Sequence, residues 1–451
     1  MFALSFTLAL VARPAPSAPD SVATGAHFRI EAHFAGDAVA NDALATAEAT
    51  WPLVTALYGP IQLGTDERLV VHLYRTAADY ERAEDALTHG RFKTNLSLTS
   101  HETREAHVAL QPDVHDSALA RIGLTMLTRE CVAHEAVHVA SAHAWPNWNT
   151  LPDWFSEGAA MWITQETMVQ GGWAPKTLDD PTLSTDARRV QRLHEAKQLP
   201  RLADIVDGKL GELTGPQRYA LWSHVFRFLH DGKTSAAFTK LAGVARATGG
   251  GAQHGEKVAR AARELLGGDA GLAALDTEFA NCVKALAPRW EEIHRSLSTR
   301  GDAWAQTAFP QSNAIAWRTD DAGGERYQLS GEFELLPGAN QQLNVLLGRT
   351  DSGFVQVAFN AGNGVTVFEF DTRREGDAAW KRLGFLEASA VRAGARVKFL
   401  VRVDKSKLTI TVDDAKAGDV DLAGHPMKGA WGLGALAGSA GLWTKIQFKR
   451  G

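Results

Sequence analysis

Apolar and polar residues alternate in short runs near the start of the chain and follow a helical spacing further on. Between about residue 150 and residue 295, apolar side chains recur every three or four positions, which is typical of amphipathic helices. The first 110 residues predict strands at 28–34, 69–74 and 105–110 and helices at 38–57 and 77–86. This order indicates an α+β lobe with a small mixed sheet, followed by a helical lobe.

The last third of the chain has a different pattern. From about residue 313, short alternating runs are separated by turn signals such as Asp351-Ser352-Gly353 and Asn363-Gly364. Many short strands with glycine-containing turns predict an all-β antiparallel sandwich over residues 313–451. A linker is expected at 298–312, where serine, threonine, glycine and proline occur close together.

The N-terminal segment resembles a targeting sequence. Residues 2–12 are mostly apolar and are followed by small residues and prolines, as in the core and exit of a signal peptide, although no positive charge precedes them. Residues 1–26 are therefore expected to be either a signal peptide or a disordered tail of an intracellular protein. The first alternative predicts a secreted, periplasmic or cell-surface protein. The chain has no run of about 20 apolar residues, so the sequence predicts no transmembrane segment.

Composition narrows the set of partners. The chain has 451 residues, of which 45% are hydrophobic and 22% are charged, and its net charge is −5. A weakly acidic balance gives no reason to expect nucleic acid or an anionic membrane as partner. The only cysteines are Cys131 and Cys282, and their spacing neither establishes nor excludes a disulfide. Cys131 is expected to be a buried apolar side chain, with a disulfide partner or an inhibitory thiol as the alternatives.

Residues 134–138 read His-Glu-Ala-Val-His within a predicted helix, 124–144. On a helix, His134 and His138 lie about 40° apart and one turn along, so both imidazoles can bind one metal ion. Glu135 lies beside that position, where a general base would hold a water molecule. The structural alternative is a buried helix whose two histidines are hydrogen-bonded within the core.

A catalytic zinc site needs a third protein ligand. The metzincin spacing fails, because Ala144 stands where that pattern has histidine and Ser141 stands where it has glycine. His143 would point away from His134 on a continuing helix and is expected at the surface. Glu157 is the better candidate, because start signals at residues 150–153 predict a second helix packed beside the first.

The word His134-Glu135-x-x-His138, followed by Trp154-Phe155-Ser156-Glu157-Gly158-Ala159-Ala160, resembles the gluzincin metallopeptidases of the peptidase MA-like kind. The resemblance implies a zincin-like peptidase domain with a Zn²⁺ cofactor. It implies His134, His138 and Glu157 as metal ligands, Glu135 as the base and a peptide or protein as substrate. The chain departs from the pattern at Met161, where many gluzincins have an aspartate that orients a ligand histidine. Asp153 is a weak substitute for that role.

Other residues are candidates for supporting roles. Tyr219 is predicted to stabilise the oxyanion, because peptidase MA-like proteins often have a tyrosine in a similar downstream helix, and His224 is a weaker candidate. The alternative for Tyr219 is an ordinary packed aromatic. Residues 105–110 are predicted to hold an extended substrate, unless they form a central strand. The glycine run at 249–251 is expected to be a surface loop. The tryptophans at 145, 148, 154, 162 and 173 are expected to pack a core.

The peptidase domain is expected to consist of two lobes, an α+β lobe with the zinc helix at 27–145 and a helical lobe at 146–297, ahead of the linker and the sandwich. The closing segments 431–434 and 442–448 resemble concanavalin A-like jelly rolls, which implies a carbohydrate as a second partner. The leading hypothesis is a zinc peptidase. The alternative is an exported carbohydrate-binding or adhesion protein with an idle peptidase lobe, and a zinc hydrolase acting on other acyl substrates is a third.

Overall fold

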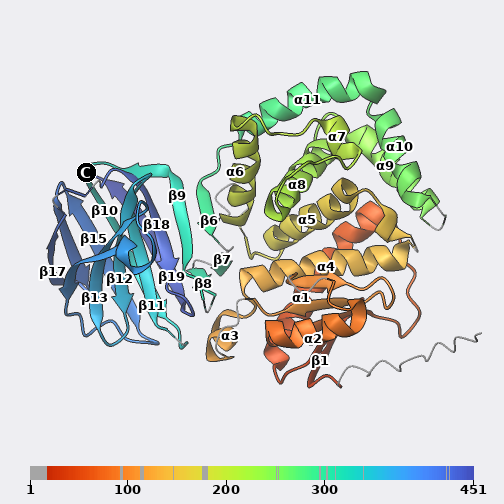
Figure 1. The fold of residues 1–451 in the computed structure, drawn as a ribbon. Coiled ribbons are helices and arrows are strands. Elements are labelled where there is room, and N and C mark those ends of the chain that lie inside the picture. Colours follow the sequence, from red (N-terminus) through yellow and green to blue (C-terminus); the bar gives the residue numbers. More distant parts are fainter. Residues whose placement is uncertain are drawn as a thin grey trace, which may run out of the picture.

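A computed structural model describes residues 18–91, 95–111, 116–145, 147–174, 181–249, 251, 253–293, 296–300, 303–309, 311–338, 340–422, 424, 425 and 427–451. It consists of an α+β lobe, a helical lobe and a β-sandwich, which lie in that order along the chain (Figure 1). Among the described residues, no helix has both the length and the apolar character needed to cross a membrane. Residues 1–17, where the signal-peptide core is predicted, lie outside the described part.

The N-terminal lobe is built on a five-stranded sheet with the order β1-β2-β3-β5-β4. Its strands are β1 (Ser21–Thr24), β2 (Phe28–Ala32), β3 (Leu69–Tyr74), β4 (Ser97–Thr99) and β5 (Ala106–Ala109). The three inner strands are parallel, and both edge strands are antiparallel to their neighbours. Alternation places Ile30 and Val71 in the main core with α1 (Asp37–Tyr58) and α4 (Met126–Ala144). Tyr74 lies on the other face, against Tyr80 of α2 (Ala77–Thr88).

Helix α4 is buried along nearly its whole length, which requires its polar side chains to have partners. Thr125 caps it by accepting from the backbone N–H of Thr128. Arg129 is 1% exposed and donates to Thr46 at 2.6 Å and to Asp42 at 2.5 Å, both on or near the first turns of α1. This buried ion pair fixes α4 against α1 and leaves the opposite side of α4 to face the helical lobe.

The helical lobe begins with α5, which returns the chain beside α4. Its helices are α5 (Asp153–Gln170), α6 (Pro181–Glu195), α7 (Leu202–Val206), α8 (Gly215–Asp231), α9 (Ser235–Thr248), α10 (His254–Leu265) and α11 (Gly268–Ala285), and the short α3 (Asp116–Ile122) precedes α4. The sequence suggests an exposed helix at 186–196, but α6 buries Ala187, Val190 and Leu193 between α8 and the sandwich. Charged residues dominate the sequence of α6, so its narrow row of buried apolar residues is not evident from the sequence.

The predicted antiparallel sandwich is confirmed as two seven-stranded sheets. One sheet has the order β17-β16-β15-β10-β19-β8-β7 and the other has the order β14-β13-β12-β11-β18-β9-β6. The strands are β6 (Trp290–Ile293), β7 (Leu297–Arg300), β8 (Ala303–Thr307), β9 (Ala314–Gly323), β10 (Arg326–Leu335), β11 (Gln342–Thr350), β12 (Gly353–Asn360), β13 (Gly364–Asp371), β14 (Trp380–Leu386), β15 (Arg396–Asp404), β16 (Lys407–Val412), β17 (Ala415–Asp421), β18 (Gly429–Ala435) and β19 (Ala440–Arg450). Phe333, Phe359 and Trp443 fill the space between the sheets.

Two predicted boundaries are wrong. Residues 298–312 do not form a linker, because β8 and most of β7 lie within this range and β6 already belongs to the sandwich. The backbone of this polar segment pairs with β8 from Leu297 to Arg300, so its conformation is set by tertiary pairing and not by its composition. Residues 1–26 are not all a leader or tail, because β1 pairs with β2 from Ser21 onward.

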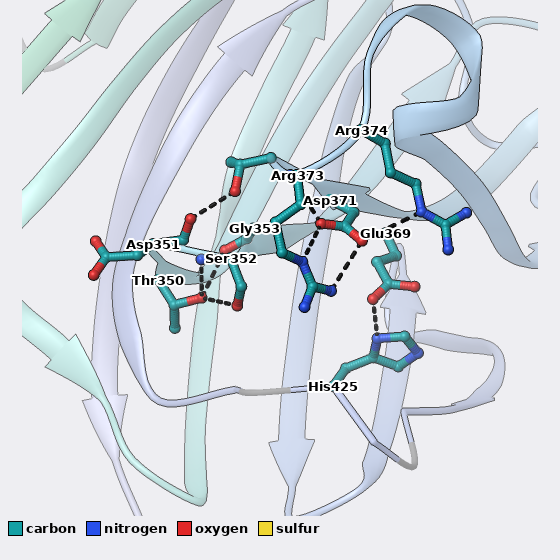
Figure 2. Close-up of polar contacts among 10 residues, drawn as sticks. Thr350, Asp351, Ser352, Gly353, Glu369, Asp371, Arg373, Arg374 and His425 are labelled. Atoms are coloured by element: carbon teal, nitrogen blue, oxygen red, sulfur yellow. Dashed lines mark hydrogen bonds and ion pairs between the residues drawn. The ribbon is translucent and has the colours of Figure 1, made fainter.

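One end of the sandwich is held by polar side chains on β11, on β13 and on the turns next to them (Figure 2). Thr350 and Ser352 hydrogen-bond each other at the β11–β12 turn, 3.0 Å apart. Asp371 accepts from the guanidinium of Arg373 at 2.8 Å and forms an ion pair with Arg374. His425 reaches back to this end, and its Nδ1 lies 2.7 Å from Glu369 Oε1.

Glu291 on β6 is expected to connect the helical lobe to the sandwich in a pH-dependent manner. Arg192 of α6 and Arg349 of β11 donate to its two oxygens at 2.7 and 3.0 Å. Burial opposes ionisation, but the two guanidinium groups outweigh it and lower the pKa of Glu291. A lowered pKa stabilises the fold above the unfolded-state value, and this contribution is lost as pH falls through the lowered pKa.

Glu291→Gln is therefore expected to reduce stability by about 1–2 kcal/mol at pH 7 and to have no effect once the pH is well below the ordinary glutamate range. Scanning calorimetry at both pH values measures this difference. Glu325→Gln is the control, because its ion pair with Lys428 is solvent-exposed. An equal loss at both pH values would contradict the ion-pair explanation.

Candidate metal centre

His134, His138 and Glu157 lie together where α4 crosses α5. The Nε2 atoms of the two histidines are 3.1 Å apart. Glu157 Oε2 lies 3.1 Å from Nε2 of His134 and 3.4 Å from Nε2 of His138. Two residues one helical turn apart and a third from the neighbouring helix thus direct one donor atom each to a common point.

These separations fit a bound zinc ion. Ligand atoms held about 2.0–2.1 Å from zinc at tetrahedral angles are about 3.3 Å from one another. The three distances of 3.1, 3.1 and 3.4 Å lie close to that value. The donor set of two imidazoles and one carboxylate also suits zinc and leaves a fourth position for water or substrate.

The charges of the cluster favour a cation. Burial raises the pKa of Glu157, but the charges and hydrogen bonds of His138 and His134 outweigh it and hold the pKa well below the ordinary value. Burial lowers the pKa of His138, but Glu157 and Glu135 outweigh it, so the net shift is upward. The carboxylate therefore stays ionised, and the site attracts positive charge, which a metal ion would supply in place of protons.

Glu135 is 5% exposed and lies beside the cluster without belonging to it. Ser97 donates to its Oε1 at 2.8 Å, and Thr99 donates to its Oε2 at 2.6 Å. Both hydroxyls come from β4, the edge strand of the sheet. The edge strand thus fixes the orientation of the carboxylate through these two hydroxyl groups.

The prediction that residues 105–110 hold an extended substrate is wrong. Strand β5 is central, with β3 on one side and β4 on the other, so its backbone groups are already paired. The strand at the sheet edge is β4, which the sequence analysis did not identify. The alternation Leu96-Ser97-Leu98-Thr99 could have indicated it. Its three residues are too short to stand out among the surrounding polar positions.

A cavity of about 510 Å³ opens beside His134 and Glu135. Ser97 from β4, Met161 from α5 and Tyr219 from α8 line it. Phe309, which follows β8, lines it as well, so the sandwich contributes to the wall. The cavity is large enough for several amino-acid side chains of a substrate.

Tyr219 lies at the cavity with its ring centroid 5.9 Å from that of His134. Its side chain is 37% exposed. Loss of solvation and the nearby charges of Glu157 and Glu135 raise its pKa, so the phenol remains a hydrogen-bond donor. The weaker candidate, His224, is not among the residues that line the cavity; its Nδ1 lies 2.8 Å from the carbonyl oxygen of Ala220.

His143 is also remote from the cluster, with Nε2 3.8 Å from Glu67, as expected for a residue at the helix end. Four of the five tryptophans near the site are buried, namely Trp145, Trp148, Trp154 and Trp162, which agrees with a packing role. Trp148 stacks on His101 at 4.9 Å and lies 5.4 Å from His138. His101 was not singled out from the sequence, since nothing in its spacing relates it to residue 138.

Asp153 does not hydrogen-bond to His138, so it does not take the orienting role considered for it. Among the described residues, Nδ1 of His138 is buried and has no hydrogen-bond partner. Met161 is buried at the cavity wall and supplies no acceptor. Cys131 is buried at the same wall, whereas Cys282 is exposed on α11, and the two do not form a disulfide.

Gly158 allows α8 to approach the helix that carries Glu157. A Cβ at this position would lie 2.9 Å from the carbonyl oxygen of Trp222 and 3.0 Å from Cβ of Phe226. Gly158→Ala is expected to cost about 1–2 kcal/mol, because overpacking exceeds the gain in helix propensity. Gly243→Ala is the control, since that helical glycine has space around it and is expected to be neutral or stabilising. Thermal unfolding compares the two, and equal effects would contradict close packing at Gly158.

Comparison with known proteins gives partial similarities only. No family model matches the chain, and no curated protein matches it. A carbohydrate-binding module of Bacillus subtilis, CBM66, is similar over 36% of this chain and 95% of that chain, with 8% identity and a TM-score of 0.31.

Two further solved structures are similar to this chain. The carbohydrate recognition domain of Emp47p is similar over 37% of this chain and 90% of that chain, at 13% identity and a TM-score of 0.27. The exoplasmic/lumenal domain of VIP36 is similar over 36% and 83%, at 13% identity and a TM-score of 0.28. All three matches fall on the C-terminal β region.

Proposed function

We propose that this protein is a zinc-dependent hydrolase that cleaves peptide bonds. The observation that supports this most strongly is the convergence of His134, His138 and Glu157 at separations of 3.1–3.4 Å, beside a buried Glu135 that is not part of the cluster. Three residues can hold a metal ion, and a fourth residue, the acidic Glu135, lies next to them where it can move protons. The adjacent edge strand suits an extended chain as substrate.

Each residue then has a defined task. When bound, zinc would polarise the scissile carbonyl and lower the pKa of a water molecule. Glu135 accepts the proton of that water and donates it to the leaving amine, while Ser97 and Thr99 hold the carboxylate in place. Tyr219 donates a hydrogen bond to the developing oxyanion.

Metal analysis combined with mass-spectrometric profiling of a peptide library tests the proposal. Peptides are expected to be cleaved by the zinc-loaded protein, to remain intact after chelation, and to be cleaved again when Zn²⁺ is returned. Cleavage that persists without metal would overturn the mechanism. Zinc-dependent hydrolysis of esters or other acyl compounds without cleavage of any peptide would favour a zinc hydrolase of another class.

Tyr219→Phe is expected to lower kcat by about 100-fold while zinc content stays the same, because one oxyanion donor is lost and no ligand changes. Steady-state kinetics and metal analysis of the same sample measure both quantities. Phe228→Leu on the same helix is the control, because Phe228 packs on Phe279 of α11 instead of lining the cavity. Full activity of the Tyr219 variant would show that this tyrosine contributes to packing and not to catalysis.

A second candidate function is carbohydrate binding by the sandwich. Phe354, Phe370 and Trp380 are partly exposed neighbours on β12, β13 and β14, with ring centroids 5.0 and 4.7 Å apart along the row. Sugar rings stack their apolar faces on aromatic side chains, and charged groups such as Asp371 and Arg373, at the same end of the sheet, can bind their hydroxyls (Figure 2). Such a partner would accord with an extracellular or periplasmic location.

A glycan-array screen of the full chain tests this second function. The full chain is used because a fragment that begins within β8, such as residues 305–451, would lack β6 and β7, which belong to the two sheets. Glycan binding that is lost in Trp380→Ala, with peptide cleavage unchanged, would assign sugar recognition to the aromatic row. If the array shows no binding to the wild type, the sandwich has another role.

A further inference from the structure

The sheet of the N-terminal lobe has a second cluster of histidines and carboxylates, on the face opposite α4. Glu31, His72 and His107 are direct partners across β2, β3 and β5, so their side chains form one row. His107 also pairs with Leu98 of β4, which packs on the α2 side. The row is therefore separated from the metal centre at α4 by the sheet itself.

In both histidines of this row, Nδ1 already contacts a polar side chain. His107 Nδ1 lies 2.9 Å from the phenol oxygen of Tyr74. His72 Nδ1 lies 3.2 Å from Nε2 of His33 and 3.6 Å from Oε2 of Glu31. Histidine ligands of metals usually bind a carboxylate or another polar group through the ring nitrogen that does not contact the metal. These contacts fix both rings and leave Nε2 as the available donor atom.

The Nε2 atom of His107 lacks the partner that burial demands, and that of His72 faces a carboxylate. His107 is 4% exposed, and its Nε2 is buried without a hydrogen-bond partner. His72 is 5% exposed, and its Nε2 lies 3.5 Å from Glu105 Oε2. The two rings stack with their centroids 4.7 Å apart, and one donor atom from each of the three residues lies within 4.8 Å of the others.

We propose that His72, His107 and Glu105 bind a second divalent transition-metal ion, with zinc as the best fit to the donor set. A metal ion supplies a partner for the buried nitrogen of His107, which otherwise costs free energy. Two imidazoles and a carboxylate favour zinc and its neighbours over calcium or magnesium, which prefer oxygen ligands. The ion joins β3 to β5, the strand that holds the edge strand β4.

The surroundings of the cluster suit entry and binding of an ion. The Glu105 side chain is 35% exposed, so the carboxylate can turn from solvent toward the histidines. Glu31 adds a negative charge next to His72.

Metal content by mass spectrometry, after loading the full chain with Zn²⁺ and removing unbound ion, tests the assignment. The wild type is expected to bind two zinc ions per chain, Glu157→Ala one, Glu105→Gln one and the double variant none. Glu67→Gln is the matched control, since Glu67 also lies beside a histidine but outside the cluster, and it is expected to bind two. Glu105→Gln is expected to fold, because glutamine has nearly the same shape as glutamate and the side chain at this position is partly exposed. Circular dichroism verifies that each variant is folded.

The outcomes separate this site from the proposed active site. If Glu105→Gln loses one zinc and Glu157→Ala loses none, the second site stands and the proposed active site fails. A wild type with one zinc, retained in Glu105→Gln and lost in Glu157→Ala, would overturn the second site and leave the active site standing. In that case the row is a hydrogen-bonded polar cluster without an ion.

Discussion

Glu135→Gln is expected to lower kcat/KM for peptide hydrolysis by about 10³-fold or more, with zinc content and fold unchanged. General acid–base catalysis contributes about 10²–10⁴-fold, and here one residue both accepts and returns the proton. The amide cannot accept a proton from water near neutral pH. Because Glu135 is not among the three converging donors, its replacement leaves the metal ligands intact.

The structure also indicates why this variant should fold. Ser97 and Thr99 donate to the two carboxylate oxygens, and their hydroxyls can rotate to accept from an amide NH₂ group instead. Glu166→Gln is the matched control, because Glu166 lies on the neighbouring helix and pairs with Arg227, and it is not among the residues lining the cavity. Kinetics on one peptide identified from the library, together with zinc analysis, measure the effect. Undiminished activity of the Glu135 variant would remove Glu135 from the mechanism.

Much of the architecture follows from local pattern. Strand β3 begins and ends at the predicted residues, 69 and 74, because an apolar run bounded by polar residues is unambiguous when it is buried on both faces. Helix α4 could be predicted from its lack of glycine and proline. The sandwich could be predicted from its regular turns, since each turn limits the strand that precedes it.

Features that depend on distant contacts were not predictable in the same way. Strand β4 has three residues, and it is ordered by pairing with β5 and by its hydroxyl contacts to Glu135, 36 and 38 residues away. Strand β6 follows the helical lobe directly and is ordered by pairing with β9 and by backbone hydrogen bonds to Ser184 and Thr185 of α6. Such elements have weak propensity of their own, and tertiary contacts decide their conformation.

The candidate site was predictable to the extent that its spacing is helical. His134 and His138 are related by one turn, so their proximity follows from α-helix geometry. The position of Glu157 rests on a weaker argument, a returning helix with small residues after the glutamate, and Gly158 shows the physical basis of that close approach. The row of Glu31, His72 and His107 could not be found, because it depends on the register between three strands.

The sandwich packs against the helical lobe and also forms part of the cavity wall. Helix α6 contacts β6, and Arg189 of α6 lines the same cavity as Phe309. A substrate in this cavity would therefore meet residues of both parts. The two candidate functions are therefore compatible. A carbohydrate bound by the sandwich would be attached to the same domain that contributes Phe309 to the cavity wall.

Glu157→Ala is expected to weaken zinc binding at the α4–α5 site by more than about 100-fold. Loss of a residue that only orients a ligand typically weakens metal binding by about 10–100-fold, and loss of a ligand itself should cost more. The carboxylate is the one anionic ligand among the three, and it holds both histidines through contacts of 3.1 and 3.4 Å. Its loss leaves two imidazoles that are fixed only by the helix. Activity is expected to fall with metal occupancy and to recover partially at high Zn²⁺ concentration.

Titration with a zinc-selective chelator measures the affinity, and the comparison is made in the Glu105→Gln background so that only one site is observed. Glu166→Ala on the same helix is the control, because it removes a carboxylate of equal size that pairs with Arg227. Similar zinc affinity in the Glu157 and Glu166 variants would exclude Glu157 as a ligand. A selective loss in the Glu157 variant, together with an inactive but zinc-bound Glu135→Gln, would separate the residue that holds the metal from the one that moves the proton.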